Sequence, residues 1–528
     1  MSQGSTKTRI AGVNDKGQPA TLAVTAEGHL EVAVHSPRMP FGEMHVESGE
    51  PIFQVDAVYG ANTSQVNATT GHATGGTSSA TATAANNLFT CSTGTTALSF
   101  GTIQSRKRLR YRAGQGVYGR YTALFSDPAA NSILVAGLGT AESGFYFGYN
   151  GTSFGVLHVT GGVREIQTLT VTTASTATNN YVVTLNGTAF NVTATNNGST
   201  TKTAYEISNG TYAGWKAAAV GSTVEFVADD AGNKTGSFSL AQTGAGTPAA
   251  GSFVETKAGV ASTDTWVPQS SWNGDKLDGT GASGVTLDPS KGNVYEISVQ
   301  YLGFGSVAMR VEAFPSGNNP DLVTAHTFSF PNTRTSVITS QPSFPFTMAA
   351  YSAGSTTNVS VSCASFAGFL AGRSVFTGPR HTFERDTNGF VGSAASTYYP
   401  MFTIRNRLNY TGRANEAVVH LLSISASHDD ATPVTIALLK NATLVGTPDF
   451  KLFSSTSCTA WDQAATTATI SDNNQKLFSL KIGQNGSIAY QFEDDITLQP
   501  GETLTVAGLA VTGTATYVSA SLNVREDQ

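Results

Sequence analysis

The sequence predicts a mainly β protein, made of β-sandwich or jelly-roll domains with one small α+β (ββαβ-like) module inserted. Two observations lead to this prediction. Apolar and polar residues alternate along most of the chain, a period of two that is typical of strands with one buried face. The composition agrees, because 55 Gly, 28 Phe and 17 Tyr in 528 residues give strand-forming runs separated by glycine-rich turns.

The clearest alternation lies in residues 291–312, KGNVYEISVQYLGFGSVAMRVE. Its odd-numbered positions are apolar on both sides of Gly303-Phe304-Gly305: Tyr295, Ile297, Val299, Tyr301, Val307, Met309 and Val311. Glu296, Ser298 and Gln300 fall on the opposite face. The pattern predicts two strands of a half-buried sheet.

A chain of this length exceeds what one hydrophobic core supports, so several domains are expected. We predict an N-terminal docking arm and hairpin (1–60), a split β-sandwich domain (61–165 together with 257–372), an inserted small domain (166–256), a hinge (373–396) and a C-terminal jelly-roll-like domain (397–528). The hairpin of the arm turns at Glu27-Gly28. Residues 62–87, rich in Thr, Ala, Gly and Asn, form either a loop or a strand of small residues.

The inserted domain is predicted because strand-like sequence changes in character near residue 166 and resumes at Trp266. Its amphipathic stretch, Lys202–Tyr212, predicts the main helix of the chain. Since the flanking segments belong to one parent domain, the two ends of the insertion should lie close together. The hinge is predicted from a basic, turn-rich stretch, GRSVFTGPRHTFERDTNG.

Charge and cysteine content exclude several classes of protein. Only 12% of residues are charged, about half the ~25% of an average domain, and the net charge of −6 gives no general attraction to nucleic acid. Cys91, Cys363 and Cys458 are odd in number and far apart, so neither a disulfide framework nor a metal site is predicted. The sequence contains no apolar run of about 18 residues, so no membrane span is predicted. The first residues do not resemble a secretory signal.

Two short motifs match functional patterns but lack the required context. Residues 151–155, GTSFG, fit a nucleophile elbow, which needs a strand, a turn and a helix, whereas Asn150-Gly151 indicates a hairpin. Residues 279–284, GTGASG, fit a dinucleotide-binding fingerprint, but Pro289 and a strand follow where a helix is required. We therefore predict a hairpin and a loop, with no catalytic residue and no cofactor.

Three carboxylates, Asp275, Asp278 and Asp288, lie in the glycine-rich stretch WNGDKLDGTGASGVTLDP. Such residues can supply oxygen ligands to calcium, although their spacing is not that of an EF-hand. Asx turns explain them without a metal. Turns are the favoured interpretation, and no metal site is predicted.

The densest basic segment is SRKRLRYRAGQGVYGR, which contains Arg106, Arg108, Arg110 and Arg112. These four arginines share one parity, so a strand would present their guanidinium groups on one face. Such a face can bind phosphates, an acidic glycan or the carboxylates of a neighbouring subunit. We predict a subunit or ligand interface, with nucleic acid the least favoured partner, and a solvated face is the alternative.

Five long phrases carry a family resemblance: PRMPFGEMHVESGEP, RLRYRAGQGVYGRYTALFS, GFYFGYNGTSFGVLHVTGG, WNGDKLDGTGASGVTLDPSKGNVYEISVQYLGFGSVAMRVE and LQPGETLTVAG. They resemble a family of β-rich structural proteins of tailed bacteriophages, which has relatives in large DNA viruses. The resemblance covers roughly residues 20–165 and 257–372, and residues 397–528 more loosely. Residues 166–256 resemble a module common in phage tail and fibre proteins.

The resemblance implies a non-enzymatic virion protein, assembled in the host cytoplasm, in a tail, neck or fibre-like appendage with a role in host attachment. It implies a homo-oligomer, with a trimer favoured, and contacts with other virion proteins and with a host surface glycan. Two alternatives stay open: a glycan-binding or glycan-degrading receptor-binding protein, and a head decoration protein. A depolymerase built as a parallel β-helix would show a short repeat, which the sequence lacks.

Overall fold

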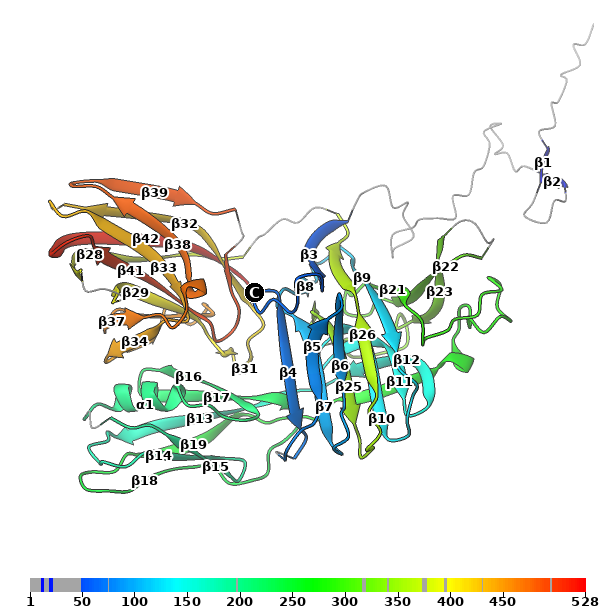
Figure 1. Cartoon of the computed structure of the whole chain (residues 1–528), viewed down its shortest axis with the longest axis horizontal. Helices are drawn as coiled ribbons and strands as arrows, with labels where there is room; N and C mark the ends of the chain where they lie inside the picture. Colours follow the sequence, from blue (N-terminus) through cyan, green and yellow to red (C-terminus); the bar gives the residue numbers. More distant parts are fainter. Residues whose placement is uncertain are drawn as a thin grey trace, which may run out of the picture.

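The computed structural model has 56% of its residues in strands and 3% in helix, which confirms the mainly β fold (Figure 1). It describes residues 11–13, 19–21 and 49–528, except 75, 196–197, 316–319, 340, 373–377, 394–396, 430 and 494–495, and only the backbone of 11–13, 19–21, 386–390 and 516. Near the N-terminus, β1 (Ala11–Val13) pairs with β2 (Pro19–Thr21). The hairpin expected at Glu27-Gly28 lies outside the described residues.

The first large unit is a sandwich of two antiparallel sheets. One sheet has seven strands in the order β20 (Thr263–Pro268), β12 (Ser153–Thr160), β11 (Gly144–Asn150), β10 (Ser132–Gly139), β25 (Phe346–Ser352), β7 (Ser99–Ser105) and β4 (Val66–His72). The other contains β23 (Asp321–Phe328), β22 (Val307–Ala313), β21 (Asn293–Val299), β9 (Val117–Phe125), β26 (Ser360–Cys363), β6 (Leu88–Ser92) and β5 (Thr81–Ala85), with β27 (Ser365–Leu370) and β3 (Glu50–Asp56) alongside. The tract at 62–87 therefore supplies two strands, β4 and β5.

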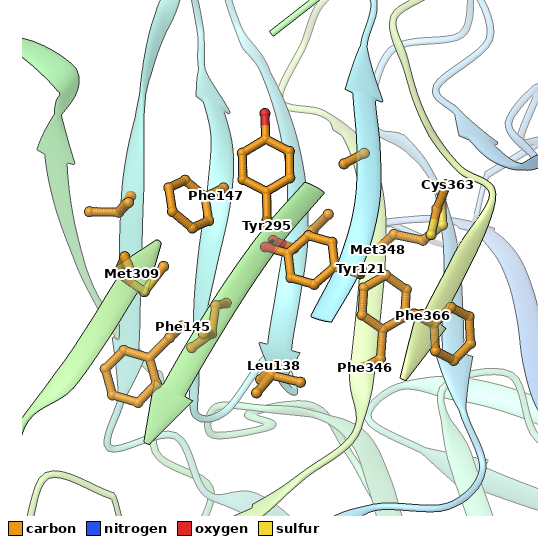
Figure 2. Close-up of a cluster of buried hydrophobic side chains, with 14 of the residues drawn as sticks. Tyr121, Leu138, Phe145, Phe147, Tyr295, Met309, Phe346, Met348, Cys363 and Phe366 are labelled. Carbon is orange, nitrogen blue, oxygen red and sulfur yellow. Dashed lines mark hydrogen bonds between the residues drawn. The ribbon is translucent and has the colours of Figure 1, made fainter. Parts of the chain in front are cut away.

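Aromatic side chains fill the space between the two sheets (Figure 2). Phe147 of β11 packs on Tyr295 of β21 with ring centroids 4.8 Å apart. The apolar face predicted for β21 and β22 is buried as expected. Glu296 differs from the prediction of a half-buried sheet, because it is only 3% exposed. Its neighbours in the register, Arg120 and Arg310, each place a guanidinium nitrogen 2.7 Å from its carboxylate and cover it.

The N-terminal boundary of this sandwich differs from the prediction. The predicted docking arm includes residues 50–56, but these residues form β3, which pairs with β27. Phe53 and Val55 of β3 are buried in the sandwich core, and Phe53 makes an edge contact with Phe366. Burial of two large apolar side chains explains why this segment joins the sheet.

The second unit is the inserted module, with two small sheets and one α-helix. Its sheets run β16 (Trp215–Val220), β17 (Thr223–Ala231), β13 (Arg164–Thr173), β19 (Ala250–Lys257), and β15 (Thr188–Val192), β14 (Tyr181–Leu185), β18 (Ser239–Gln242). The first and last strands pair, with Ile166 opposite Lys257, so the ends of the insertion lie side by side as expected. The helix α1 (Thr200–Ser208) begins earlier than the predicted Lys202–Tyr212 because Ser199 caps it by accepting from the Lys202 N–H. It also ends earlier than predicted, with Asn209 as its C-cap.

The third unit is a second two-sheet sandwich at the C-terminal end. One sheet contains β28 (Arg380–Gly392), β42 (Thr514–Asp527), β32 (Val418–His428), β39 (Ser487–Gln491) and β40 (Thr497–Leu498). The other runs β35 (Lys451–Leu452), β36 (Thr459–Asp462), β29 (Tyr399–Asn406), β41 (Thr503–Ala510), β33 (Val434–Lys440) and β38 (Lys476–Ile482). The remaining short elements are β8 (Leu109–Arg110) with β24 (Ser343–Phe344), β30 (Asn409–Tyr410) with β31 (Arg413–Ala414), β34 (Thr443–Gly446) with β37 (Ala465–Thr469), and the 3-10 turns η1 (Gln269–Ser271) and η2 (Asn473–Gln475).

The predicted hinge at 373–396 is wrong for most of its described residues. Residues 380–392 form β28, which pairs with β42 along nearly its whole length. Phe383 of β28 is 1% exposed and packs in the core of the C-terminal sandwich. The charged, glycine-containing sequence fits an outer strand that bulges between Arg385 and Gly389, since such strands carry charges and irregularities.

Candidate interdomain site

The arginine segment lies where the sandwich meets the C-terminal domain. It is not a long strand, because only Leu109 and Arg110 form β8. Leu109 is fully buried in the sandwich core and anchors the segment. The four arginine side chains are 16–28% exposed, which excludes the solvated face.

Each of the four arginines forms an ion pair with a carboxylate of the C-terminal domain. Arg106 lies 3.0 Å from Glu502, and Arg108 pairs with Glu416. The charges of Arg110 and Arg112 both lie near Asp527, at 3.7 and 3.2 Å. These partners belong to the same chain, so the segment forms an interface between domains, in place of the predicted subunit or ligand interface.

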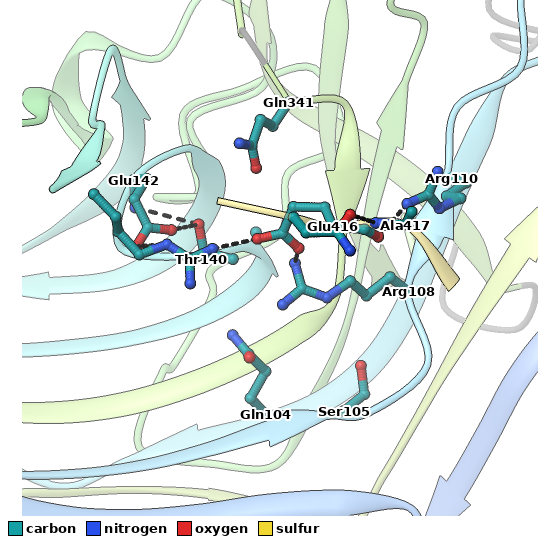
Figure 3. Close-up of polar contacts among 12 residues, drawn as sticks. Gln104, Ser105, Arg108, Arg110, Thr140, Glu142, Gln341, Glu416 and Ala417 are labelled. Carbon is teal, nitrogen blue, oxygen red and sulfur yellow. Dashed lines mark hydrogen bonds and ion pairs between the residues drawn. The ribbon is translucent and has the colours of Figure 1, made fainter. Parts of the chain in front are cut away.

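Glu416 is the centre of this interface (Figure 3). Its carboxylate pairs with Arg108, and its backbone carbonyl accepts a hydrogen bond from Arg110. Burial alone would raise the pKa of the Glu416 carboxyl, but the arginines around it outweigh that effect and hold the pKa below its usual value. The carboxylate is therefore ionised at neutral pH.

The inserted module joins the same cluster through Arg164, the first residue of β13. Arg164 pairs with Glu142, in the turn between β10 and β11, at 3.4 Å, and also with Glu416. Burial alone would lower the pKa of Arg164, but the two carboxylates hold it above its usual value. One guanidinium thus links all three units of the chain.

A cavity of about 110 Å³ lies at this three-way junction. Its lining contains four cationic side chains, those of Arg108, Arg164, Lys257 and Arg413. Glu142 is the one carboxylate in the lining. Thr140, Ser143, Gln341 and Ser343 add neutral polar groups from the sandwich.

A second contact joins the module directly to the C-terminal domain. Arg405 of β29 is 6% exposed, donates to the Ala219 carbonyl at 2.8 Å, and lies 3.7 Å above the Phe450 ring. Burial lowers the pKa of Arg405 to about 10. Tyr205 of α1 stacks on the same Phe450 ring at 6.4 Å. The module and the C-terminal domain therefore share one apolar cluster.

The two motif-like stretches have the geometry of turns. Residues 144–160 form the β11–β12 hairpin, in which Asn150 pairs with Ser153 and Gly151 has a φ of 59°. Residues 279–284 form a loop in which Asp278 bridges Thr286, and no helix follows before β21. The turn interpretations of both stretches are confirmed.

The three aspartates of the glycine-rich loop act within their own turns. Asp275 accepts from the Leu277 and Ser283 N–H groups, and Asp278 and Asp288 accept from the N–H groups two residues ahead of them. Hydrogen bonds from the Thr280 and Ser290 hydroxyls, together with these backbone bonds, lower the pKa of Asp278 and of Asp288. Within the described residues, no group of three or more His, Cys, Asp or Glu side chains could hold a metal ion.

The cysteines, and the most deeply buried histidine among the residues that the structure describes, pack in the hydrophobic cores. Cys91, Cys363 and Cys458 are buried and free, and burial raises the pKa of each thiol, that of Cys363 to about 12. His158 stacks on Phe145 at 4.6 Å, and burial lowers its pKa to about 4. Such thiols stay protonated at neutral pH and are poor nucleophiles.

No protein-family model matches the chain, and no curated protein matches it. In the described part of the chain, no helix is long and apolar enough to cross a membrane.

Sequence reasoning found the arginines of this site but not their partners. Glu502, Glu416 and Asp527 follow Arg106, Arg110 and Arg112, respectively, by more than 300 positions in the sequence. Arg164 stands alone at the predicted boundary of the inserted module. The position of Arg164 at the junction of two predicted domains is the one feature of the sequence that indicates a role in an interdomain contact.

Proposed function

We propose that this chain is a structural virion protein of a tailed bacteriophage, part of a tail, neck or fibre-like appendage with a role in host attachment. The observation that carries the proposal is the use of charge. The chain has few charged residues, yet its arginine-rich segment and Arg164 form ion pairs that join three β-rich units. Such linkage suits a protein whose role is to keep a shape under load.

The outer strands of the sheets provide surfaces for assembly. β5 and β23 end one sheet of the first sandwich, and β4 and β20 end the other. Outer strands offer backbone hydrogen-bonding groups to neighbouring chains, and closed symmetric assemblies cover them. We propose a homo-oligomer, with a trimer favoured, that contacts other virion proteins.

A second candidate, glycan binding, is favoured by one specific surface. Phe478 of β38, Tyr490 of β39 and Phe492 form a cluster with ring centroids 4.6–5.4 Å apart. Tyr490 is 43% exposed, and β39 and β38 are outer strands of the two different C-terminal sheets. Aromatic rings with an apolar face and a polar tip are frequent at binding surfaces.

Cryo-electron microscopy of the intact particle tests the proposal. Density for this fold at a tail, neck or fibre position is expected. Density spread over the capsid lattice would support head decoration instead. Incubation of the purified protein with host envelope polysaccharide is the second test, and release of oligosaccharides would contradict a purely structural role.

A further inference from the structure

The cavity at the three-way junction has an excess of positive charge. Arg108 and Arg164 are already engaged with Glu416 and Glu142. Lys257 and Arg413 also line the cavity, and among the residues that the structure describes neither has a carboxylate within ion-pair distance. Lys257 and Arg413 therefore line the same cavity without an ion pair to a described carboxylate of the chain.

The neutral groups of the lining also leave hydrogen-bonding capacity unused. The Ser343 hydroxyl is buried and has no hydrogen-bond partner in the structure. A buried hydroxyl without a partner carries a desolvation cost that a ligand oxygen would remove. The cavity also exceeds a single water in size, since a water needs about 10–15 Å³ of such space.

The arrangement of these groups defines the class of ligand. Lys257 comes from the last strand of the inserted module, Arg413 from the β30–β31 hairpin, and Ser343 from β24 of the sandwich. Guanidinium and ammonium groups that line one cavity from two different units suit an anion with several oxygen atoms, such as phosphate or sulfate. A neutral ligand would leave both charges unpaired.

We infer that this cavity binds a small tetrahedral oxyanion of the phosphate or sulfate class, held by Lys257 and Arg413 with Ser343 as a hydroxyl donor. The bound anion contacts the sandwich, the module and the C-terminal domain at once. Because it binds the assembled junction and not the separated units, it stabilises their association by mass action.

Isothermal titration calorimetry of the full chain with inorganic phosphate, at constant ionic strength set with sodium chloride, tests the inference. We expect saturable binding with one site per chain, and a rise of the thermal midpoint with phosphate. The double variant Lys257→Gln with Arg413→Gln should bind at least tenfold more weakly. Both side chains are exposed, so circular dichroism should show an unchanged fold.

The control variant carries Lys291→Gln with Lys481→Gln, two exposed lysines that are not part of the cavity lining and give the same change of charge. It should bind phosphate like the unmodified protein, and Arg413→Lys should keep part of the affinity. If the control variant binds phosphate as weakly as the double variant, binding follows net charge, and this result would overturn the proposed oxyanion site. Absence of saturable binding, or acetate binding as tightly as phosphate and sulfate, would overturn the oxyanion assignment.

Discussion

Arg106 of the first sandwich lies 3.0 Å from Glu502 of the C-terminal domain, 396 positions later in the chain. Glu502 also lies 2.9 Å from Lys440, so its charge is shared between two cations. The contact belongs to a row of ion pairs that Arg108, Arg110 and Arg112 continue. The association of the two domains therefore depends on charge in partly desolvated surroundings, and charge substitutions should separate them.

The first prediction concerns Glu416, which pairs with two arginines. Glu416→Gln should destabilise the domain association by about 3–5 kcal/mol, because loss of one partner leaves buried charges uncompensated. Urea unfolding followed by tryptophan fluorescence measures the effect. Glu255→Gln, at an exposed position of the module, is the control and should change stability by about 0.5 kcal/mol or less. Equal effects of the two substitutions would mean that the ion pairs at Glu416 contribute nothing net.

The second prediction separates an interface within the chain from an interface between subunits. Arg108→Glu with Arg110→Glu places new carboxylates beside Glu416 and Asp527, and like charges repel. The radius of gyration from small-angle X-ray scattering should rise at every protein concentration, since the separation is internal. A change in mass without an increase in the size of the single chain would instead indicate a contact between subunits. Lys291→Glu with Lys481→Glu serves as the control of equal charge.

The third prediction is a pH dependence that arises from His158. Its pKa falls from 6.5 to about 4 in the folded chain because burial disfavours the imidazolium. Between these values the unfolded chain binds a proton that the folded chain does not, so stability is present above pH ~6.5 and is lost as the pH falls toward 4. The loss should be about 3 kcal/mol.

His158→Phe keeps a ring against Phe145 and removes the titrating group. Thermal midpoints measured from pH 7 to pH 4 should fall less steeply in this variant than in the unmodified protein. Parallel curves would show that His158 has the same pKa in the folded and the unfolded chain, and would contradict the lowered pKa.

The alternation of apolar and polar residues predicted the buried faces of the sheets more accurately than the domain boundaries. Ile297 and Met309 were predicted on a buried face and lie there, because burial of apolar side chains dominates within a strand. The parity of the arginines predicted a subunit or ligand interface, whereas the structure places these side chains between two domains of one chain, and Glu416 and Asp527 could not be chosen as partners. Their contacts depend on how two folded sandwiches meet, and local pattern carries no information about that. The outer strand β28 was missed for a related reason, since its charges and bulge resemble a linker.

The last prediction concerns the inserted module. Replacement of Thr168–Ala250 by a short Gly/Ser linker should leave the first sandwich folded, because its core contains no residue of the module and the flanking strands lie side by side. The C-terminal domain should be destabilised, since Arg405 loses the Ala219 carbonyl and Phe450 loses Tyr205.

Limited proteolysis with mass spectrometry distinguishes these outcomes. Cleavage in the C-terminal domain should begin at lower protease concentration than in the unmodified protein, while the first sandwich stays intact. The matched control is Tyr205→Ala in the full chain, which removes one contact and should give an intermediate result. Resistance of the C-terminal domain to cleavage in the deletion variant would show that its own two-sheet core is sufficient, and that the shared cluster serves only to position the module.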